Sequence, residues 1–272
     1  MGNHYKLIGT IVLSFFLIPA TGIEKDRSNN QPAGIRLQAY RNGNRTISEH
    51  VNQIKPTCIY LTIDDGPSDA SFFLSNIAMA DSALFNLFVI GDSVRKNESR
   101  KMFFQLYQLN HFIEIGNHSF SHANKHYHDY YMHPTAVVND FLLNEYTLGL
   151  QNKIARLPGR NTWRIDGRER TDLGDDSTAA NLLLLRGYRI FGWDVEWHWP
   201  TDSSHSIKTA HEMIQQIEHI VLKKNSFAPG HIVVLCHESM FIDSASRVQL
   251  ELFIDGIRQK EGYRLEHLSN YP

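Results

Sequence analysis

The sequence predicts an α/β protein built on parallel β-strands. Apolar runs rich in β-branched residues alternate with stretches of helical periodicity along most of the chain, and strands that helices separate pair in parallel. The polar motifs directly follow strands, and in such folds the carboxyl ends of the strands form the working face. The 272 residues, 42% of them hydrophobic, suffice for one large core. The strand count alone does not separate a barrel from an open sheet.

The first half of the chain contains three expected strands. The first apolar run ends at an Asp-Asp-Gly-Pro turn, the second at Gly-Asp-Ser, and the third at a glycine that precedes two histidines. Residue spacing predicts two helices between these strands and a long amphipathic stretch after them. The strands are expected at 57–63, 84–90 and 112–115, and the helical stretches at 70–80, 99–109 and 134–154.

The second half continues the alternation. Strands are expected at 155–158, 188–195, 230–236 and 263–268, with helices at 178–186, 207–222 and 248–260. Two polar segments interrupt the pattern: 126–133 is rich in histidine and tyrosine, and 160–176 is rich in charged residues. The first segment has no ligand spacing that indicates a metal. Both segments are expected to be surface loops, although 160–176 could instead select a substrate.

The N-terminus has the pattern of a secretory signal peptide. Lys6 supplies a charge, 7–19 is mostly apolar, and Ala-Thr-Gly at 20–22 is a small-residue cleavage site. The apolar run is shorter than the ~20 residues that span a bilayer, although an uncleaved membrane anchor or a buried helix is an alternative. We therefore expect a signal peptide over 1–22, a linker or irregular segment over 23–51, and one domain over 52–272. The mature protein would be secreted or periplasmic, without stable membrane insertion.

The net charge argues against a nucleic-acid partner, and the positions of the cysteines argue against a disulfide. The net charge is -2 and the basic residues form no run, so a nucleic-acid partner is not expected. The only cysteines, Cys58 and Cys236, lie at the start and near the end of two predicted strands. If those strands pair in parallel with aligned ends, the sulfurs are offset by about 16 Å, beyond the reach of a disulfide. We expect two free, buried thiols.

The most informative pattern is a pair of histidines downstream of a pair of aspartates. His118 and His122 are four residues apart, which places both imidazoles on one face of a helix, where they can bind one cation. Asp64 and Asp65 lie at the end of the first predicted strand. Adjacent strand residues point to opposite sides, so one carboxylate would bind metal and the other would transfer protons.

Two further segments follow the aspartate and histidine pairs along the chain. They are Arg156-Leu157-Pro158-Gly159, and Leu235-Cys236-His237 at the end of a late strand. In this order the four segments resemble the motifs of the polysaccharide deacetylases, which are carbohydrate esterase family 4 proteins with a NodB homology domain. The resemblance extends from about Cys58 to the end of the chain; its first two motifs match closely and the rest more loosely. It implies a single domain folded as a distorted (β/α) barrel of about seven parallel strands.

The resemblance implies a metal site and the residues around it. It assigns Asp65, His118 and His122 to the metal, leaving positions for water and substrate. Two imidazoles and a carboxylate suit zinc best, with cobalt, nickel, manganese or iron as alternatives. A metal lowers the pKa of a bound water from ~16 towards ~7. The resemblance then implies that Asp64 is the catalytic base and that Arg156 orients it.

The resemblance also implies an acid for the leaving group, His237. A carboxylate beside it would keep it protonated, and the candidates are Asp194 and Glu196. The fourth motif of the family, Asp-x-x-Asp-Trp, is not reproduced here, and Asp194 is the preferred choice of the two.

The third motif departs from its usual form, Arg-Pro-Pro-Tyr-Gly, because Gly159 occupies the tyrosine position. A backbone N–H at Gly159 would still bind an oxyanion, whereas glycine has no ring to contact a sugar. Trp193 and Trp197 lie in a tryptophan-rich run whose rings would either stack on sugars or pack in the core.

The expected function is removal of acetyl groups from an N-acetylated glycan by a secreted, metal-dependent hydrolase. An O-acetyl esterase would use the same residues, and so would an amidase of a small non-sugar C–N substrate. A non-catalytic glycan-binding module is a third reading, since the third and fourth motifs are altered. The acetylated glycan is the expected partner; its identity and the oligomeric state are left open.

Overall fold

The computed structural model describes residues 56–198 and 208–272, which lie within one compact unit. The predicted signal peptide and linker, the first residues of the predicted domain, and Trp199 lie outside the described residues. Within the two described ranges, no helix is long and apolar enough to cross a membrane.

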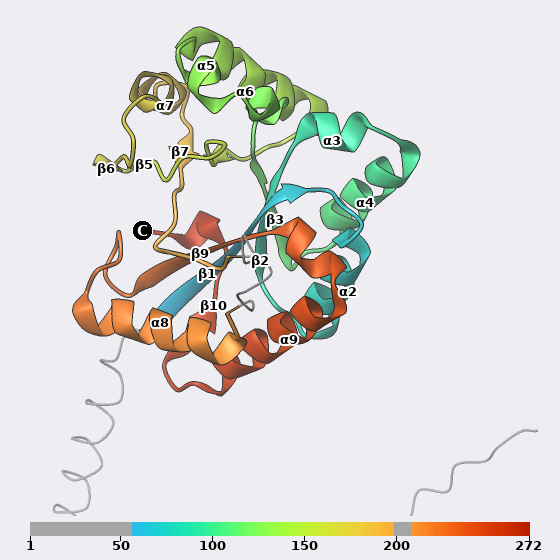
Figure 1. Ribbon diagram of the computed structural model, residues 1–272, viewed down its shortest axis with the longest axis vertical. Helices are drawn as coiled ribbons and strands as arrows, with labels where there is room; N and C mark the ends of the chain where they lie inside the picture. The colour runs from blue at the N-terminus through green and yellow to red at the C-terminus, as the bar shows by residue number, and fades with distance from the viewer. Residues whose placement is uncertain (1–55, 199–207) are drawn as a thin grey trace, which may run out of the picture. The chain divides into compact units, whose positions relative to one another are not determined.

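The strands of the described residues form one sheet that is mostly parallel (Figure 1). They are β1 (Thr57–Gly66), β2 (Phe85–Val89), β3 (Ile113–Asn117), β4 (Ile154–Ala155), β5 (Trp163–Ile165), β6 (Arg168–Arg170), β7 (Arg189–Ile190), β8 (Val195–Glu196), β9 (His231–His237) and β10 (Tyr263–Leu265). Their order is β6-β5-β7-β4-β3-β2-β1-β9-β8, and β10 pairs with β1. The predicted parallel pairing is confirmed, except that β5 runs antiparallel to β6 and β7.

The connection from β7 to β8 shows that the sheet curls. In a flat sheet, the six steps from β7 to β8 in the strand order, at about 4.8 Å each, would separate these strands by roughly 29 Å. The backbone from Ile190 to Val195 spans at most about 18 Å. The two sides of the sheet must therefore approach each other, which confirms a distorted barrel over an open sheet. The predicted strand at 188–195 is accordingly split into two short strands that pair on opposite sides.

The helices flank this sheet (Figure 1). They are α2 (Ser71–Ala80), α3 (Gly91–Arg95), α4 (Glu98–Leu109), α5 (Tyr127–Tyr131), α6 (Pro134–Leu148), α7 (Ser177–Leu184), α8 (Ala210–Lys223) and α9 (Ser244–Gln259), with short 3₁₀ helices η1 (His122–Lys125), η2 (Glu238–Ile242) and η3 (Leu268–Asn270). The stretch predicted as helical to residue 154 ends earlier, because Gly149 adopts the left-handed conformation (φ 65°) that terminates α6. A Thr209–Glu212 capping box begins α8.

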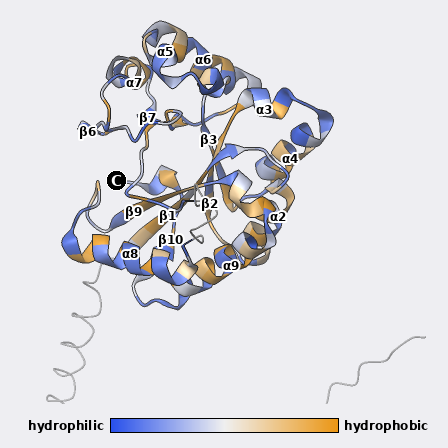
Figure 2. Ribbon diagram, viewed as in Figure 1, coloured by the Kyte–Doolittle hydropathy of each residue, from blue (hydrophilic) through white to orange (hydrophobic). Residues whose placement is uncertain are grey.

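Strand β1 carries an apolar layer on each face. Ile59, Leu61 and Ile63 face the large cluster shared with the helices, whereas Cys58 and Tyr60 belong to a second cluster inside the curled sheet. Hydrophobic residues accordingly concentrate along the strands (Figure 2). By the same alternation, Thr62 and Asp64 point to the inner side, so the end of β1 delivers a carboxylate into the barrel.

The prediction of two free, buried thiols is confirmed. Cys58 pairs with His231 across β1 and β9, and Ile63 pairs with Cys236. The two cysteines are thus offset by five positions along adjacent strands, and burial raises the pKa of the Cys236 thiol well above its usual value.

The two polar segments expected to be loops contain secondary structure. Part of 126–133 forms α5, and part of 160–176 forms the β5–β6 hairpin. The hairpin extends the sheet beyond β7, and its Trp163 is fully buried against Phe227. A three-residue strand in a charged segment gives no period-2 signal, so tertiary packing decides its conformation.

Candidate active site

The candidate site lies at the carboxyl ends of β1, β3 and β9. Asp64 pairs with His237 across β1 and β9, and His118 directly follows β3. A cavity of about 270 Å³ opens there. It is lined by Asp64, Asp65, His118, His122, Tyr127, Leu157, Gly159, Asp172, Trp193, Glu196, Leu235 and His237. Most of the residues that the sequence singled out therefore surround one cavity.

The two aspartates do not point to opposite sides, as alternation along a strand predicts. The pairing of β1 with β2 shifts register between Asp64 and Gly66, and Asp65 has a φ of 72°. This bulge re-aims the Asp65 side chain. As a result both carboxylates approach His118, whose Nε2 lies 3.6 Å from Asp64 Oδ2 and 3.4 Å from Asp65 Oδ1.

The prediction that His118 and His122 share a helix face is wrong. The chain after β3 is a loop with φ of 63° at Ser119, and η1 continues with positive φ at all four residues of His122–Lys125. Side-chain hydrogen bonds hold this conformation: Asn117 Oδ1 accepts from the Ser119 N–H at 3.0 Å, and Ser119 Oγ accepts from the His122 N–H at 3.0 Å. The histidines converge because this strained loop folds back.

Helix α6 supports the same loop from behind. The Asp140 carboxylate accepts hydrogen bonds from the Ser121 N–H and hydroxyl and from the Tyr130 hydroxyl. Asn144 donates to Asn117 Oδ1 at 2.8 Å. Sequence reasoning missed both residues, because a polar residue on an amphipathic helix carries no local sign of what it supports.

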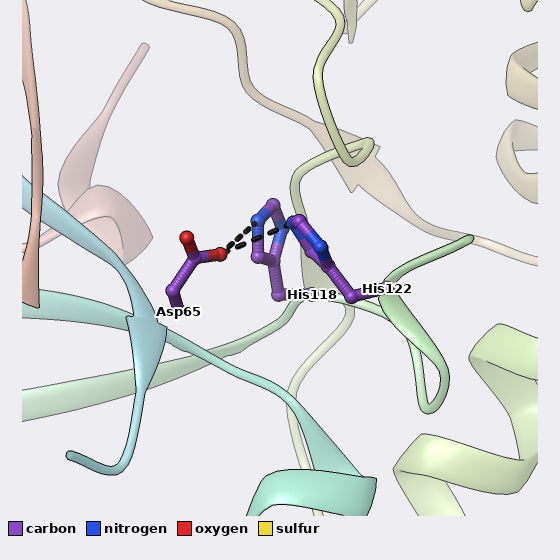
Figure 3. A group of neighbouring side chains, drawn as sticks. All are labelled: Asp65, His118 and His122. Atoms are coloured by element: carbon purple, nitrogen blue, oxygen red, sulfur yellow. Dashed lines mark ion pairs between the residues drawn. The ribbon is translucent and has the colours of Figure 1, made fainter. Parts of the chain in front are cut away.

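The three predicted metal ligands form one cluster, drawn in Figure 3. Their ligand atoms lie within 4.8 Å of one another, and Asp65 Oδ1 is 3.1 Å from His122 Nε2. The Nδ1 of His118 lies 3.0 Å from the Arg156 carbonyl oxygen, which can only accept, so in the neutral ring Nδ1 carries the proton and Nε2 would offer its lone pair to a cation. This donor set fits a divalent cation.

The charges within the cluster are strongly coupled. Burial alone would raise the pKa of Asp65, but its contacts with His118 and His122 outweigh burial and lower it. Burial likewise opposes protonation of His118, yet Asp64 and Asp65 raise its pKa. The buried Asp65 Oδ1 has no hydrogen-bond partner among the described residues. The carboxylate therefore requires positive charge beside it, from protonated imidazoles or from a cation.

Arg156 is fully buried and holds one side of Asp64. Its Nη1 donates to Asp64 Oδ1 at 2.8 Å and to Thr62 Oγ1 at 2.7 Å. Its Nε and Nη2 donate to the backbone carbonyls of Phe191 and Gly192 at 3.1 and 2.8 Å. The guanidinium is thus fixed in one orientation. Asp64 Oδ2 remains directed towards His118 and the cavity.

The structure favours Glu196 over Asp194 as the carboxylate near His237. Asp194 Oδ1 and Oδ2 accept hydrogen bonds from the Phe227 and Val233 N–H groups at 2.7 and 2.9 Å, and Asp194 is not among the cavity-lining residues. Burial raises its pKa. Glu196 lines the cavity with His237 and pairs with Leu235 across β8 and β9. The preference for Asp194 is therefore corrected, because the break after β7 changes which side chain faces inward.

The predicted substrate-facing residues separate into two groups. Gly159, with a φ of 64°, and Trp193 both line the cavity. Trp197 does not: it is 1% exposed, packs against Phe253 and donates from Nε1 to the Lys208 carbonyl. The expectation of a sugar contact at Trp197 is therefore wrong, and the alternative, packing in the core, holds.

Glu238, the residue after His237, restrains the turn that follows Asp65. Its buried Oε1 accepts from the Ser68 N–H at 2.7 Å and hydroxyl at 2.8 Å, and from the Ser71 hydroxyl at 2.5 Å. Burial raises the pKa of this carboxyl. A Cβ placed on Gly66 would overlap Glu238 Oε2. A side chain at position 66, between the bulge and the turn, would therefore displace the Glu238 carboxylate.

Gly66→Ala should consequently lower the free energy of unfolding by about 1–3 kcal/mol and weaken zinc binding, because relief of the overlap moves Asp65. Urea titration and zinc titration of the purified protein measure the two effects. Gly149→Ala is the control, since a Cβ there meets no atom within 4 Å; it should destabilise through its positive φ without changing zinc affinity. Wild-type zinc affinity in Gly66→Ala would show that Gly66 does not control the position of Asp65.

Comparison with known proteins identifies structural relatives. No family model and no curated protein matches the chain. The catalytic domain of peptidoglycan N-acetylglucosamine deacetylase from Eubacterium rectale is 21% identical, with a TM-score of 0.57 over 79% of this chain and 90% of that chain. A CE4 esterase from Streptococcus mutans is 20% identical, with a TM-score of 0.59 over 80% and 90%.

A CE4 family pseudoenzyme from Bacillus anthracis is also similar, with 16% identity and a TM-score of 0.51 over 80% of this chain and 66% of that chain. The shared architecture therefore includes proteins with and without activity. At these identities the likeness establishes the architecture: the chain has the fold of the CE4 deacetylases.

Proposed function

We propose that the protein is a metal-dependent deacetylase of carbohydrate esterase family 4, acting on an N-acetylated glycan. The observation that carries this proposal is the convergence of Asp65, His118 and His122 in one cavity that Asp64 and His237 also line. A glycan-binding module has no need for a buried carboxylate–guanidinium pair beside a metal-ligand cluster. The N-terminal pattern supports export, which would bring the enzyme to extracellular or cell-wall glycans.

Asp65, His118 and His122 would hold the cation, and zinc suits this donor set best, with cobalt, nickel, manganese or iron as alternatives. When bound, such a cation polarises a carbonyl oxygen and lowers the pKa of water. The chain's own residues supply the rest of the chemistry.

Asp64 would accept the proton of the attacking water. Arg156 occupies Oδ1, so Oδ2 is the oxygen available for this transfer. The backbone N–H of Gly159 would bind the oxyanion of the tetrahedral intermediate. His237 would donate a proton to the leaving nitrogen, and Glu196 lines the same cavity.

The proposal is tested by acetate release from a matched panel of N- and O-acetylated glycans and a small non-sugar amide. We expect release from N-acetylated glycans by the zinc-loaded protein. Release only from esters would replace the N-deacetylase by an O-acetyl esterase, and release only from the small amide would indicate an amidase. Glycan binding without any release would indicate a non-catalytic module.

Metal removal should decrease acetate release at least about 100-fold, because a Lewis acid contributes several kcal/mol of transition-state stabilisation. Chelation followed by added zinc, with metal content measured in parallel, tests this expectation. His122→Ala should lose the metal, whereas the matched control His128→Ala, which alters an exposed histidine outside the cluster, should keep it. Activity that persists after complete removal of metal would contradict the mechanism.

A further inference from the structure

The ring of Tyr127 occupies the space beside Gly159. Tyr127 begins α5, directly after the loop that carries His122, and is therefore distant in sequence from Gly159. A Cβ placed on Gly159 would lie 3.2 Å from Tyr127 Cε1 and 3.3 Å from its Cδ1 and Cζ. These distances are shorter than ordinary carbon–carbon contacts, so a side chain at position 159 would require the Tyr127 ring to shift by a few tenths of an ångström.

Neighbouring groups fix the orientation of this ring. It meets the His122 imidazole edge to face, with ring centroids 5.7 Å apart and an interplanar angle of 86°. The Arg160 guanidinium lies 5.9 Å from the ring centroid and is itself held by Asp175 through hydrogen bonds of 2.8 and 2.7 Å. Tyr127 therefore forms a preformed wall of the cavity next to a metal ligand.

The phenol presents both apolar and polar contact surface to the cavity. Tyr127 is half-buried and lines the cavity together with Trp193. Within residues 56–198 and 208–272, no group forms a hydrogen bond with its hydroxyl. An aromatic face stacks on the C–H face of a pyranose, and a free hydroxyl can donate to or accept from a sugar oxygen or acetamide group.

We propose that Tyr127 is a substrate-contacting residue, whose ring packs against the acetylated sugar and whose hydroxyl hydrogen-bonds to it, and that this ring fills the space beside Gly159, where a positive φ favours glycine. This inference rests on the proposed function for the class of substrate. The competing role is purely structural, in which Tyr127 only supports His122 in the metal cluster.

Binding of an N-acetylglucosamine oligomer to the zinc-loaded full chain separates the two roles. Calorimetry should give a Kd about tenfold higher for Tyr127→Ala, and about threefold higher for Tyr127→Phe, which loses only the hydroxyl. Zinc content should equal that of the wild type in both variants. An unchanged Kd in Tyr127→Ala, or weaker binding that only follows loss of zinc, would overturn the proposal.

A double-mutant cycle tests the complementarity of Tyr127 and Gly159. Gly159→Ala should weaken oligomer binding in the wild-type background, because the new methyl group displaces the Tyr127 ring. The same change in the Tyr127→Ala background should have a smaller effect, since the strain of the positive φ at position 159 is common to both backgrounds and cancels in the cycle. Additive effects would refute the pairing.

Acetate release, measured beside binding, distinguishes failure of this inference from failure of the proposed function. If the wild type binds the oligomer but releases no acetate, and Tyr127→Ala weakens binding, the result supports the substrate contact of Tyr127 and contradicts the deacetylase function. If the wild type releases acetate and Tyr127→Ala changes neither Kd nor KM, the result supports the deacetylase function and contradicts the substrate contact of Tyr127. A wild type that neither binds nor cleaves the oligomer contradicts both.

Discussion

Asp64→Asn is expected to decrease acetate release by roughly 10²–10⁴-fold, the usual contribution of a general base. The amide is nearly isosteric and retains an oxygen for the Arg156 hydrogen bond, so the fold should survive. Zinc content should not change, because Asp65, His118 and His122 form the ligand cluster without Asp64. Steady-state kinetics and metal analysis on the same preparation measure both quantities.

Asp69→Asn is the matched control for this substitution. Asp69 lies on the surface after the same strand, with its side chain 73% exposed and paired with Arg100. It should retain wild-type kinetics. Full activity in Asp64→Asn would remove the proposed base, and loss of zinc in that variant would place Asp64 among the metal ligands instead.

Arg156→Leu should have the largest effect on stability, lowering the free energy of unfolding by about 3–5 kcal/mol. The side chains of Asp64 and Arg156 are 4% and 0% exposed, so removal of the guanidinium leaves a buried carboxylate without its partner. Four hydrogen bonds from the guanidinium are lost as well. Urea-induced unfolding measures the change.

The double variant Asp64→Asn/Arg156→Leu separates charge from packing. It should recover part of the lost stability, because the neutral amide leaves no buried charge. Arg189→Leu is the control: it removes a pair with Asp166, whose side chain is 61% exposed, and one hydrogen bond to the Tyr271 carbonyl, so it should lower the free energy of unfolding by less than Arg156→Leu does. If both single arginine variants lose the same free energy of unfolding, or if the double variant regains none of it, the Asp64–Arg156 charge pair does not account for the lost stability. Arg156→Lys, which keeps the charge, provides the measurement if the leucine variant does not fold.

The residue types at the site were predictable where the chemistry is local. Paired aspartates at a strand end and paired histidines after another strand supply donor atoms that suit a metal, and the family resemblance assigned Asp65, His118 and His122 to it. The reason given for the histidine convergence was nevertheless wrong, since a loop with positive φ at Ser119 and His122 brings the rings together. The family resemblance selected the three residues of the cluster, while the backbone conformation that brings the histidines together depends on Asn117 and Asp140.

Assignments in the fourth motif failed for a different physical reason. The alternation of side chains in a strand predicts which residues face inward only if the strand is continuous. The chain crosses from β7 to β8 at 191–194, which turns Asp194 towards the backbone of β9 and buries Trp197 against α9. The residues of the Trp-Asp-Val-Glu-Trp run contain no local pattern that predicts the break between β7 and β8.

By itself, the sequence determined the alternating strands and helices, the parallel pairing, the free cysteines and the three residues of the candidate metal cluster. Periodicity and donor chemistry are properties of neighbouring residues, so they can be read along the chain. Only the tertiary structure decided that Glu196 rather than Asp194 faces the cavity, that Asp65 bulges towards His118, and that Tyr127 lies against Gly159. These arrangements depend on which distant segments pack together, because burial and close contact are set by the folded chain as a whole.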